Sequence, residues 1–296
     1  MTASIIQQLI DEPILHMEEL DPGYAEHASD VWLVQTSSSE VVVRRSRLTE
    51  PPSREFWWGC MHLFGIDPRA LSQFEANARI LRSVPEVPVP QIILRAEVAG
   101  REYLVVEKMN GVQLPNFKHQ SSELLHQLGV WLAKVHAKRY DEYGNLARTY
   151  VQPQEFFHRQ LADTMEQLVI RDCKDEPAIT RMLDEMLQAL SALPAPGHLC
   201  PILVDLDPSQ FLTQNGMLSA IVDVEAYAIA PREFDFISLE YTLDEPSALA
   251  FTEGYRTILD LPDLSQCRRV YRYFYRLLGV QGSVEIDQWL AQPKLF

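Results

Sequence analysis

The sequence predicts an α+β protein of two lobes, in which a small β-rich lobe precedes a larger and mainly helical one. Apolar residues alternate over short segments in roughly the first hundred residues. After Asn110-Gly111 they recur at helical spacing instead, and no linker long enough to separate independent domains is present. We therefore expect the first lobe to span residues 1–110 and the second to span 111–296, with a ligand cleft between them.

Two strand pairs and one helix make up the predicted small lobe. Strands are expected at 30–36 and 40–47, joined by a serine turn, and at 91–98 and 101–109, joined by Ala99-Gly100. Between the pairs, Leu71, Phe74 and Leu81 share one face of a helix expected over 68–83. The proline-rich segment 84–90 ends this helix, because proline cannot continue it.

The larger lobe is predicted to hold two groups of helices with short strands between them. Helices are expected over 122–137, 153–171 and 177–193, and again over 232–241, 246–259 and 264–278. Residues 201–225 separate the two groups. Here the apolar segments are short and the turn Asn215-Gly216 predicts a hairpin.

This central segment carries three polar side chains suited to phosphoryl transfer. Asp205 follows an apolar strand, Gln210 lies in the next turn, and Asp223 follows the hairpin. A carboxylate at the first position can orient an attacking hydroxyl, while an amide and a second carboxylate are oxygen ligands for Mg²⁺. The alternative is that both aspartates are ordinary turn residues. Their order and flanking strands favour the functional interpretation.

The segment resembles the catalytic and metal-binding loops of the aminoglycoside phosphotransferase family, whose fold is a variant of the protein-kinase fold. That family usually has His-Gly-Asp-x-x-x-x-Asn, followed later by an apolar pair and Asp. This chain has Leu203-Val204 in place of His-Gly and Gln210 in place of Asn. The resemblance implies a two-lobed protein-kinase-like fold that uses ATP and Mg²⁺, with Asp205 as catalytic base and Gln210 and Asp223 as metal ligands.

The resemblance also implies a nucleotide site in the small lobe. A cation at Arg44 would grip the phosphates and be held by the helix carboxylate of Glu75, although Arg45 on the opposite face of the strand competes for this role. Backbone groups around Glu107, Lys108 and Met109 would bind the adenine edge. A glycine-rich phosphate loop is missing, and the segment around Gly23 takes its place.

Two further residues match the family but are expected to be structural. Asp235 is expected to brace the catalytic loop or cap a helix, and His136 follows an apolar helix. The changes at Leu203 and Gln210 also leave a second function open. The chain could be a catalytically weak nucleotide-binding pseudoenzyme or a scaffold of the same fold.

The net charge of the chain and its distribution limit the classes of molecule that are expected to bind it. The formal charge of −15 argues against nucleic acid, and nine acids against one arginine between residues 201 and 245 would suit a cationic acceptor. The acceptor itself stays open among aminoglycosides, sugars, amino alcohols and nucleosides. We expect no membrane span, no signal peptide and a cytoplasmic protein whose four cysteines are buried thiols. The oligomeric state is not predicted.

Two segments of the sequence are rich in aromatic residues. Residues 55–65, which include two tryptophans, form an insertion that could pack within the small lobe, line the cleft or form a dimer contact; packing within the lobe is favoured. The late helix carries Arg268, Arg269, Arg272 and Arg276 beside three tyrosines. Ion pairs with acids of the larger lobe explain these arginines better than nucleic-acid binding does.

Overall fold

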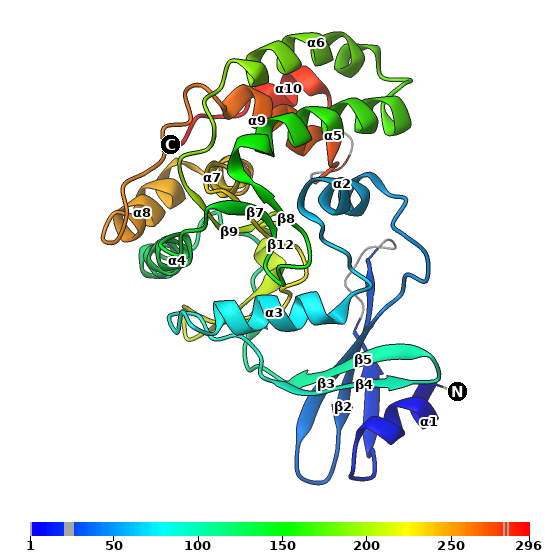
Figure 1. Ribbon diagram of the computed structural model, residues 1–296. Helices are drawn as coiled ribbons and strands as arrows, with labels where there is room; N and C mark the ends of the chain where they lie inside the picture. Colours follow the sequence, from blue (N-terminus) through cyan, green and yellow to red (C-terminus); the bar gives the residue numbers. More distant parts are fainter. Residues whose placement is uncertain (1, 21–26, 281, 283) are drawn as a thin grey trace.

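A computed structural model describes residues 2–20, 27–280, 282 and 284–296. The segment around Gly23 predicted to replace the phosphate loop falls largely outside these residues. The N-terminal region is built on a five-stranded antiparallel sheet in the order β1-β2-β3-β5-β4 (Figure 1). Its strands are β1 (His16–Glu19), β2 (Ser29–Gln35), β3 (Glu40–Ser46), β4 (Ile92–Val98) and β5 (Arg101–Glu107).

The sheet and one helix agree with the sequence-based prediction. Four of the strands coincide with the predicted segments to within two residues, and α3 (Leu71–Leu81) is the predicted helix. Two elements were not predicted: the edge strand β1 and the short helix α1 (Thr2–Ile6), whose Ile6 is buried in a small core with Trp32 and Val43. Both elements are too short for apolar periodicity to reveal them.

The C-terminal region is mainly helical, as predicted. Its helices are α4 (Ser122–His136), α5 (Phe157–Asp172), α6 (Pro177–Ser191), α7 (Glu233–Thr242), α8 (Glu245–Tyr255), α9 (Arg268–Leu277) and α10 (Ile286–Leu290). α4 and α8 pack closely because Gly129 and Gly254 each face the backbone of the other helix. A Cβ atom at Gly129 would lie 2.1 Å from the carbonyl oxygen of Phe251, so this approach requires glycine.

Two small sheets lie between the helices and carry the loops of interest. One has the order β11-β10-β6 and the other the order β8-β7-β12-β9. The predicted hairpin is β10 (Phe211–Gln214) and β11 (Met217–Ile221), with positive φ at both Asn215 and Gly216. The remaining strands are β6 (Val112–Gln113), β7 (Glu142–Asn145), β8 (Val151–Pro153), β9 (Leu199–Leu203) and β12 (Tyr227–Pro231).

The aromatic insertion does not pack within the N-terminal sheet, so that prediction is wrong. It forms α2 (Glu55–Phe64), which packs against α5 and the β7 strand of the C-terminal region (Figure 1). Cys60, Leu63 and Phe64 are buried in the main core. Trp58 stacks on His62, with the Arg171 guanidinium 4.1 Å from the centre of a Trp58 ring. Gly59, with no side chain, lets Leu278 approach the helix closely.

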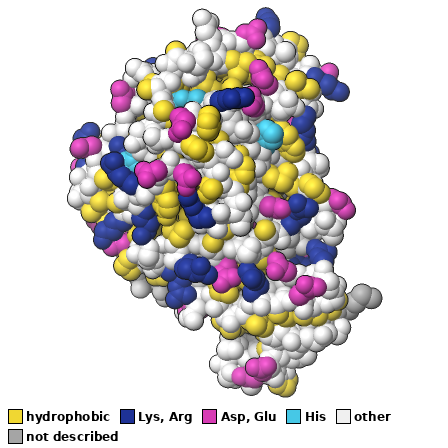
Figure 2. Space-filling model, in the orientation of Figure 1, with side chains coloured by type: hydrophobic (Ala, Val, Ile, Leu, Met, Phe, Trp, Pro, Cys, Tyr) yellow, Lys and Arg dark blue, Asp and Glu magenta, His cyan; other side chains and the backbone are white. Residues whose placement is uncertain are grey.

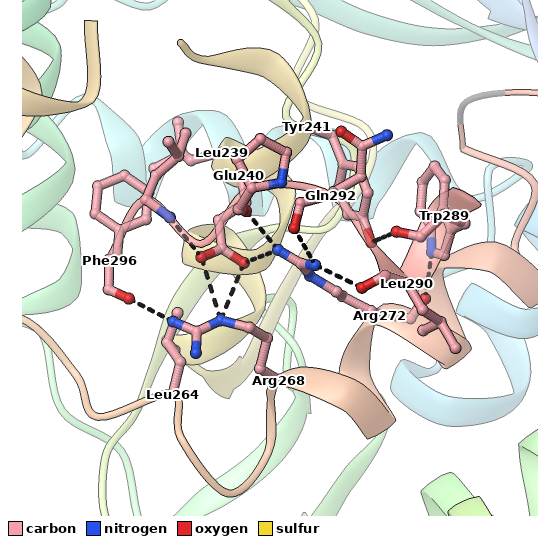
Figure 3. A network of polar contacts seen from close by, with 12 residues as sticks. Leu239, Glu240, Tyr241, Leu264, Arg268, Arg272, Trp289, Leu290, Gln292 and Phe296 are labelled. Atoms are coloured by element: carbon pink, nitrogen blue, oxygen red, sulfur yellow. Dashed lines mark hydrogen bonds and ion pairs between the residues drawn. The ribbon is translucent and has the colours of Figure 1, made fainter. Parts of the chain in front are cut away.

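The arginines of α9 form ion pairs with acids of the same region, which confirms the prediction. Arg268 and Arg272 both contact the buried Glu240 of α7, and Arg272 also donates to carbonyl oxygens between Leu290 and Pro293 (Figure 3). Arg276 pairs with Glu176 and Arg269 with Glu185. Buried arginines therefore fix the last segment of the chain onto α7 and α9.

The cysteines, the helix lengths and the surface charges also bear on what the composition predicted. All four cysteines are buried and unpaired. Among the described helices, none has the length and apolar character needed to cross a membrane. On the face shown in Figure 2, acidic and basic side chains are interspersed.

Candidate active site

The loop that carries Asp205 begins where β9 ends at Leu203. The amide of Val204 still donates to the carbonyl of Ala226, at 3.0 Å, and the chain then leaves the sheet. Asp207 caps the short helical turn 208–210 by accepting from the amide of Ser209 at 2.7 Å. Asp205 therefore lies between the end of a strand and a capped turn, in a partly buried position.

Asp235 braces this loop, as the sequence predicted. Its carboxylate accepts the amide hydrogen of Leu203 at 2.9 Å and contacts Nε2 of His136 at 3.0 Å. The Tyr255 hydroxyl accepts from Arg232 at 3.1 Å and can therefore donate to Nδ1 of His136, at 2.9 Å. This order assigns the hydrogen of a neutral His136 to Nε2, and burial lowers the pKa of His136 well below its usual value.

The bracing explains how the loop tolerates Leu203. Leu203 is fully buried, and its backbone amide, which any residue offers, makes the contact to Asp235. A histidine side chain is not needed for this interaction. The change from the family pattern at this position leaves the support of Asp205 in place.

Asp205 has the electrostatics of a base that works near neutral pH. Burial raises its pKa to about 7, and the negative charges of Asp207 and Asp223 add to this effect. A carboxylate with such a pKa holds a proton more tightly than an exposed aspartate does. It is therefore a stronger proton acceptor for a hydroxyl group.

The backbone brings the segments of Gln210 and Asp223 close together. The amide of Val222 donates to the carbonyl of Gln210 at 2.9 Å, so Asp223 is one residue from this contact. Nε2 of Gln210 donates to the carbonyl oxygen of Asp205 at 2.8 Å, which turns Oε1 away from that group. Oε1 is buried without a hydrogen-bond partner in the described part of the chain, whereas the Asp223 side chain is 47% exposed.

This donor set fits Mg²⁺. The ion commonly takes one or two carboxylates from the protein and completes its octahedron with phosphate oxygens and water. Asp223 offers the charge, and the unpartnered Oε1 of Gln210 offers a neutral oxygen. Across the described residues, no group of three or more His, Cys, Asp or Glu side chains is arranged to hold a metal ion. A site here would therefore depend on oxygen atoms of a bound nucleotide.

Arg44 lies at this site, but the predicted ion pair between Arg44 and Glu75 is wrong. Arg44 is buried and bonds to Glu225, with Asp223 Oδ1 3.6 Å from its guanidinium. Glu75 instead pairs with Arg79 at 3.2 Å and with Arg95 at 3.0 Å. The reason is the orientation of α3, which directs Phe74 toward Arg44 and leaves Glu75 at the helix surface.

The two arginines of β3 point to opposite faces of the sheet and have different partners. Arg45 points to the other face of the sheet, where it donates to Asp30 at 2.9 Å and to the Tyr103 hydroxyl at 3.0 Å. Arg44 alone of the two contacts Asp223 and Glu225. The strand alternation used in the sequence analysis thus separates the two residues correctly.

The predicted hinge residues lie at the end of β5. Leu104 is paired with Arg44 and Glu107 with Val41, so Glu107 is three strand residues, or about 10 Å, from the level of Arg44. The Glu107 amide donates to the Gln91 carbonyl at 2.9 Å, and Lys108 contacts Glu40 at 3.3 Å. A cavity of about 420 Å³ beside Lys108 is lined by polar residues of the 35–40 turn and none of the catalytic loop.

Three further residues at the site, Glu225, Ser29 and Asn77, were not assigned a role from the sequence. Glu225 bonds to Arg44, Ser29 donates to Glu225, and Asn77 Nδ2 donates to the Val224 carbonyl at 2.7 Å. The position of Glu225 two residues after Asp223 was a usable signal, since both follow the same strand. Ser29 and Asn77 carried none, because their partners are distant in sequence.

A family model decides the relationship that this geometry suggests. The model of the "phosphotransferase enzyme family", abbreviated APH, matches residues 23–270. The chain belongs to this family. It is a kinase-like phosphotransferase, and the resemblance noted in the catalytic loop therefore extends over most of the chain.

Solved structures agree on the fold. A macrolide 2′-phosphotransferase from Brachybacterium faecium superposes with a TM-score of 0.63 at 14% identity, covering 98% of this chain and 97% of that one. A spectinomycin phosphotransferase bound to ADP and spectinomycin superposes with a TM-score of 0.62 at 13% identity, covering 93% of this chain and 85% of that one. A mutant aminoglycoside 2′-phosphotransferase bound to GDP superposes with a TM-score of 0.63 at 19% identity, covering 98% of this chain and 92% of that one. The search of curated proteins returned no match.

Proposed function

We propose that this phosphotransferase moves the γ-phosphoryl group of ATP to a hydroxyl group of a small molecule, with Mg²⁺ as cofactor. One observation carries the proposal: the buried Oε1 of Gln210 has no partner among the described residues, while Gln210 bonds to the Asp205 carbonyl and Asp223 lies near both Asp205 and Arg44. An unpaired buried oxygen is costly, and a metal ligand is a sufficient reason to keep it. ADP in one relative and GDP in another support nucleotide binding.

Each residue has a distinct role in the proposed reaction. Asp205 accepts the proton of the acceptor hydroxyl as its oxygen attacks the γ-phosphorus atom of ATP, and the bond from that phosphorus to the β–γ bridging oxygen breaks, so that ADP leaves; the raised pKa of Asp205, about 7, favours the proton transfer. Gln210 and Asp223 would hold Mg²⁺, which would offset the charge of the phosphate groups. Arg44 binds phosphate oxygens. The Glu107 carbonyl and the backbone of Lys108 and Met109 bind the adenine edge.

The acceptor is proposed to be cationic or polyhydroxylated. Relatives of this fold are named for macrolides, spectinomycin and aminoglycosides. In this chain Asp207 and Asp223 lie close enough to raise the pKa of Asp205, and Arg44 is already bonded to Glu225. The excess negative charge would attract an amino sugar or an amino alcohol.

The alternative, a weak nucleotide-binding pseudoenzyme, rests on the changes at Leu203 and Gln210. The Asp235 contact weakens the first reason, because the loop is braced through the backbone. Both the phosphotransferase and the pseudoenzyme would bind nucleotide, and a thermal melting experiment tests this shared property. MgATP should raise the melting temperature of the protein, since a ligand that binds only the folded state stabilises it.

Two variants give this experiment its controls. Asp223→Ala should abolish the metal-dependent part of the shift, whereas Asp205→Asn should retain it. No shift at millimolar ATP, with or without Mg²⁺, would contradict the proposal. Equal shifts in the parent and in both variants would show that the metal ligands are wrongly assigned.

A further inference from the structure

Arg44 is held on more than one side. Its guanidinium carbon lies 4.1 Å from the centre of the Phe74 ring, and its terminal nitrogen bonds to Glu225. Only 5% of the residue is exposed, and its Nε is buried without a partner in the described part of the chain. A guanidinium presents five hydrogens in a rigid fork, so a group held in this way still has donors to offer a phosphate.

Glu225 connects the two regions of the protein. Besides Arg44 on β3 it accepts a hydrogen bond from Ser29, at the start of β2. Both strands belong to the N-terminal sheet, whereas Glu225 follows the β10–β11 hairpin of the C-terminal region. Asn77 of α3 adds contacts to the carbonyl oxygens of Val224, at 2.7 Å, and of Glu225, at 3.3 Å.

No comparable role is open to Glu75 in this arrangement. Its two carboxylate oxygens contact Arg79 and Arg95, and its side chain is 31% exposed. The Glu225 side chain is 10% exposed. A buried charged hydrogen bond fixes a side chain much more firmly than a solvent-exposed ion pair does.

We propose that Glu225 is the residue that positions Arg44 for the nucleotide phosphates, in place of the carboxylate on helix α3. The assignment rests on the proposed function. Because Glu225 lies two residues after Asp223, one short segment sets both the phosphate-binding cation and the proposed metal ligand. Phosphate binding then depends directly on contact between the two regions of the protein. Binding of the adenine and ribose alone does not depend on this contact.

The test compares the affinities of variants for MgATP and for adenosine, which lacks phosphates. Glu225→Gln should weaken MgATP binding about 10- to 100-fold, the range expected for loss of a hydrogen bond to a charged group, and leave adenosine binding unchanged. Glu142→Gln removes the same charge from an exposed ion pair with Arg148 and serves as the matched control. It should bind both ligands as the parent does.

Glu75→Gln tests the competing assignment. Parental MgATP affinity in this variant supports the role of Glu225, and a loss equal to that of Glu225→Gln overturns it. Parental affinity in Glu225→Gln also overturns it. Ser29→Ala provides a milder perturbation that keeps both charges, and it should weaken MgATP binding by a smaller factor with adenosine binding unchanged.

The outcomes separate this assignment from the proposed function. Failure of the parent protein to bind MgATP would overturn both. Parental MgATP binding together with an unaffected Glu225→Gln variant would overturn only the role of Glu225. Equal losses of MgATP and adenosine affinity in Glu225→Gln would show a general structural role and would also overturn the assignment.

Discussion

Replacing Glu240 by glutamine should destabilise the protein far more than the same change at Glu185. Both residues form ion pairs with arginines of α9, so the two substitutions differ mainly in burial. The side chains of Glu240 and Arg272 are 0% and 2% exposed, whereas those of Glu185 and Arg269 are 59% and 55% exposed. Glutamine at 240 keeps the volume and removes the charge.

The magnitude follows from what Arg272 would lose. Removing one partner of a buried ion pair costs about 3–5 kcal/mol, because the remaining charge is left without compensation. Arg272 keeps three backbone carbonyl oxygens, of Leu290, Gln292 and Pro293, so we expect the lower end of this range. The exposed pair should contribute less than about 1 kcal/mol.

Urea unfolding measures the difference. Circular dichroism and tryptophan fluorescence should be followed together, since coincident transitions are needed to obtain a free energy of unfolding. Trp289, one of five tryptophans in the chain, stacks on Tyr241 beside the network with ring centres 3.8 Å apart, so part of the fluorescence signal comes from this part of the fold (Figure 3). Losses within about 1 kcal/mol of each other in Glu240→Gln and Glu185→Gln would refute the assignment of a buried, energetically significant network.

Three other predictions concern the site and pH. Gln210→Asn should keep nucleotide binding and measurable basal ATP hydrolysis, whereas Gln210→Leu, which lacks the carbonyl, should lose most hydrolysis; equal rates would contradict the metal-ligand role. Since burial raises the pKa of Asp205 from its usual 3.8 to about 7, its ionisation opposes folding increasingly as pH rises from about 4 to 7, so Asp205→Asn should be more stable than the parent at about pH 8 and lose this advantage as pH falls to about 4 in urea titrations. Burial lowers the pKa of His158 to about 4, so the parent should lose stability as pH falls from about 6.5 to 4, and a His158→Gln variant that loses as much would disprove this cause.

Local sequence patterns predicted most of the fold. Apolar periodicity located α4 and α9, and strand alternation distinguished Arg44 from Arg45. The Asn215-Gly216 turn predicted the hairpin because positive φ at both positions suits these residues. Each of these features depends on residues close together in the chain.

Features that depend on distant contacts were not predictable in the same way. The pairing of Arg44 with Glu225 joins residues 181 positions apart, and it depends on the rotation of α3 about its axis. One helical position separates Phe74, which contacts Arg44, from Glu75, which does not. The packing of α2 on α5 likewise follows from tertiary burial of Cys60, Leu63 and Phe64 rather than from their spacing alone.

The most direct test is detection of the phosphorylated product. Phosphorus NMR of the parent protein with ATP, Mg²⁺ and a panel of aminoglycosides, sugars and amino alcohols should reveal a new phosphate monoester. Asp205→Asn should bind MgATP as the parent does and form that product about 10²- to 10⁴-fold more slowly. An unchanged rate in Asp205→Asn, or bound MgATP with no ester formed from any acceptor in the panel, would contradict the account.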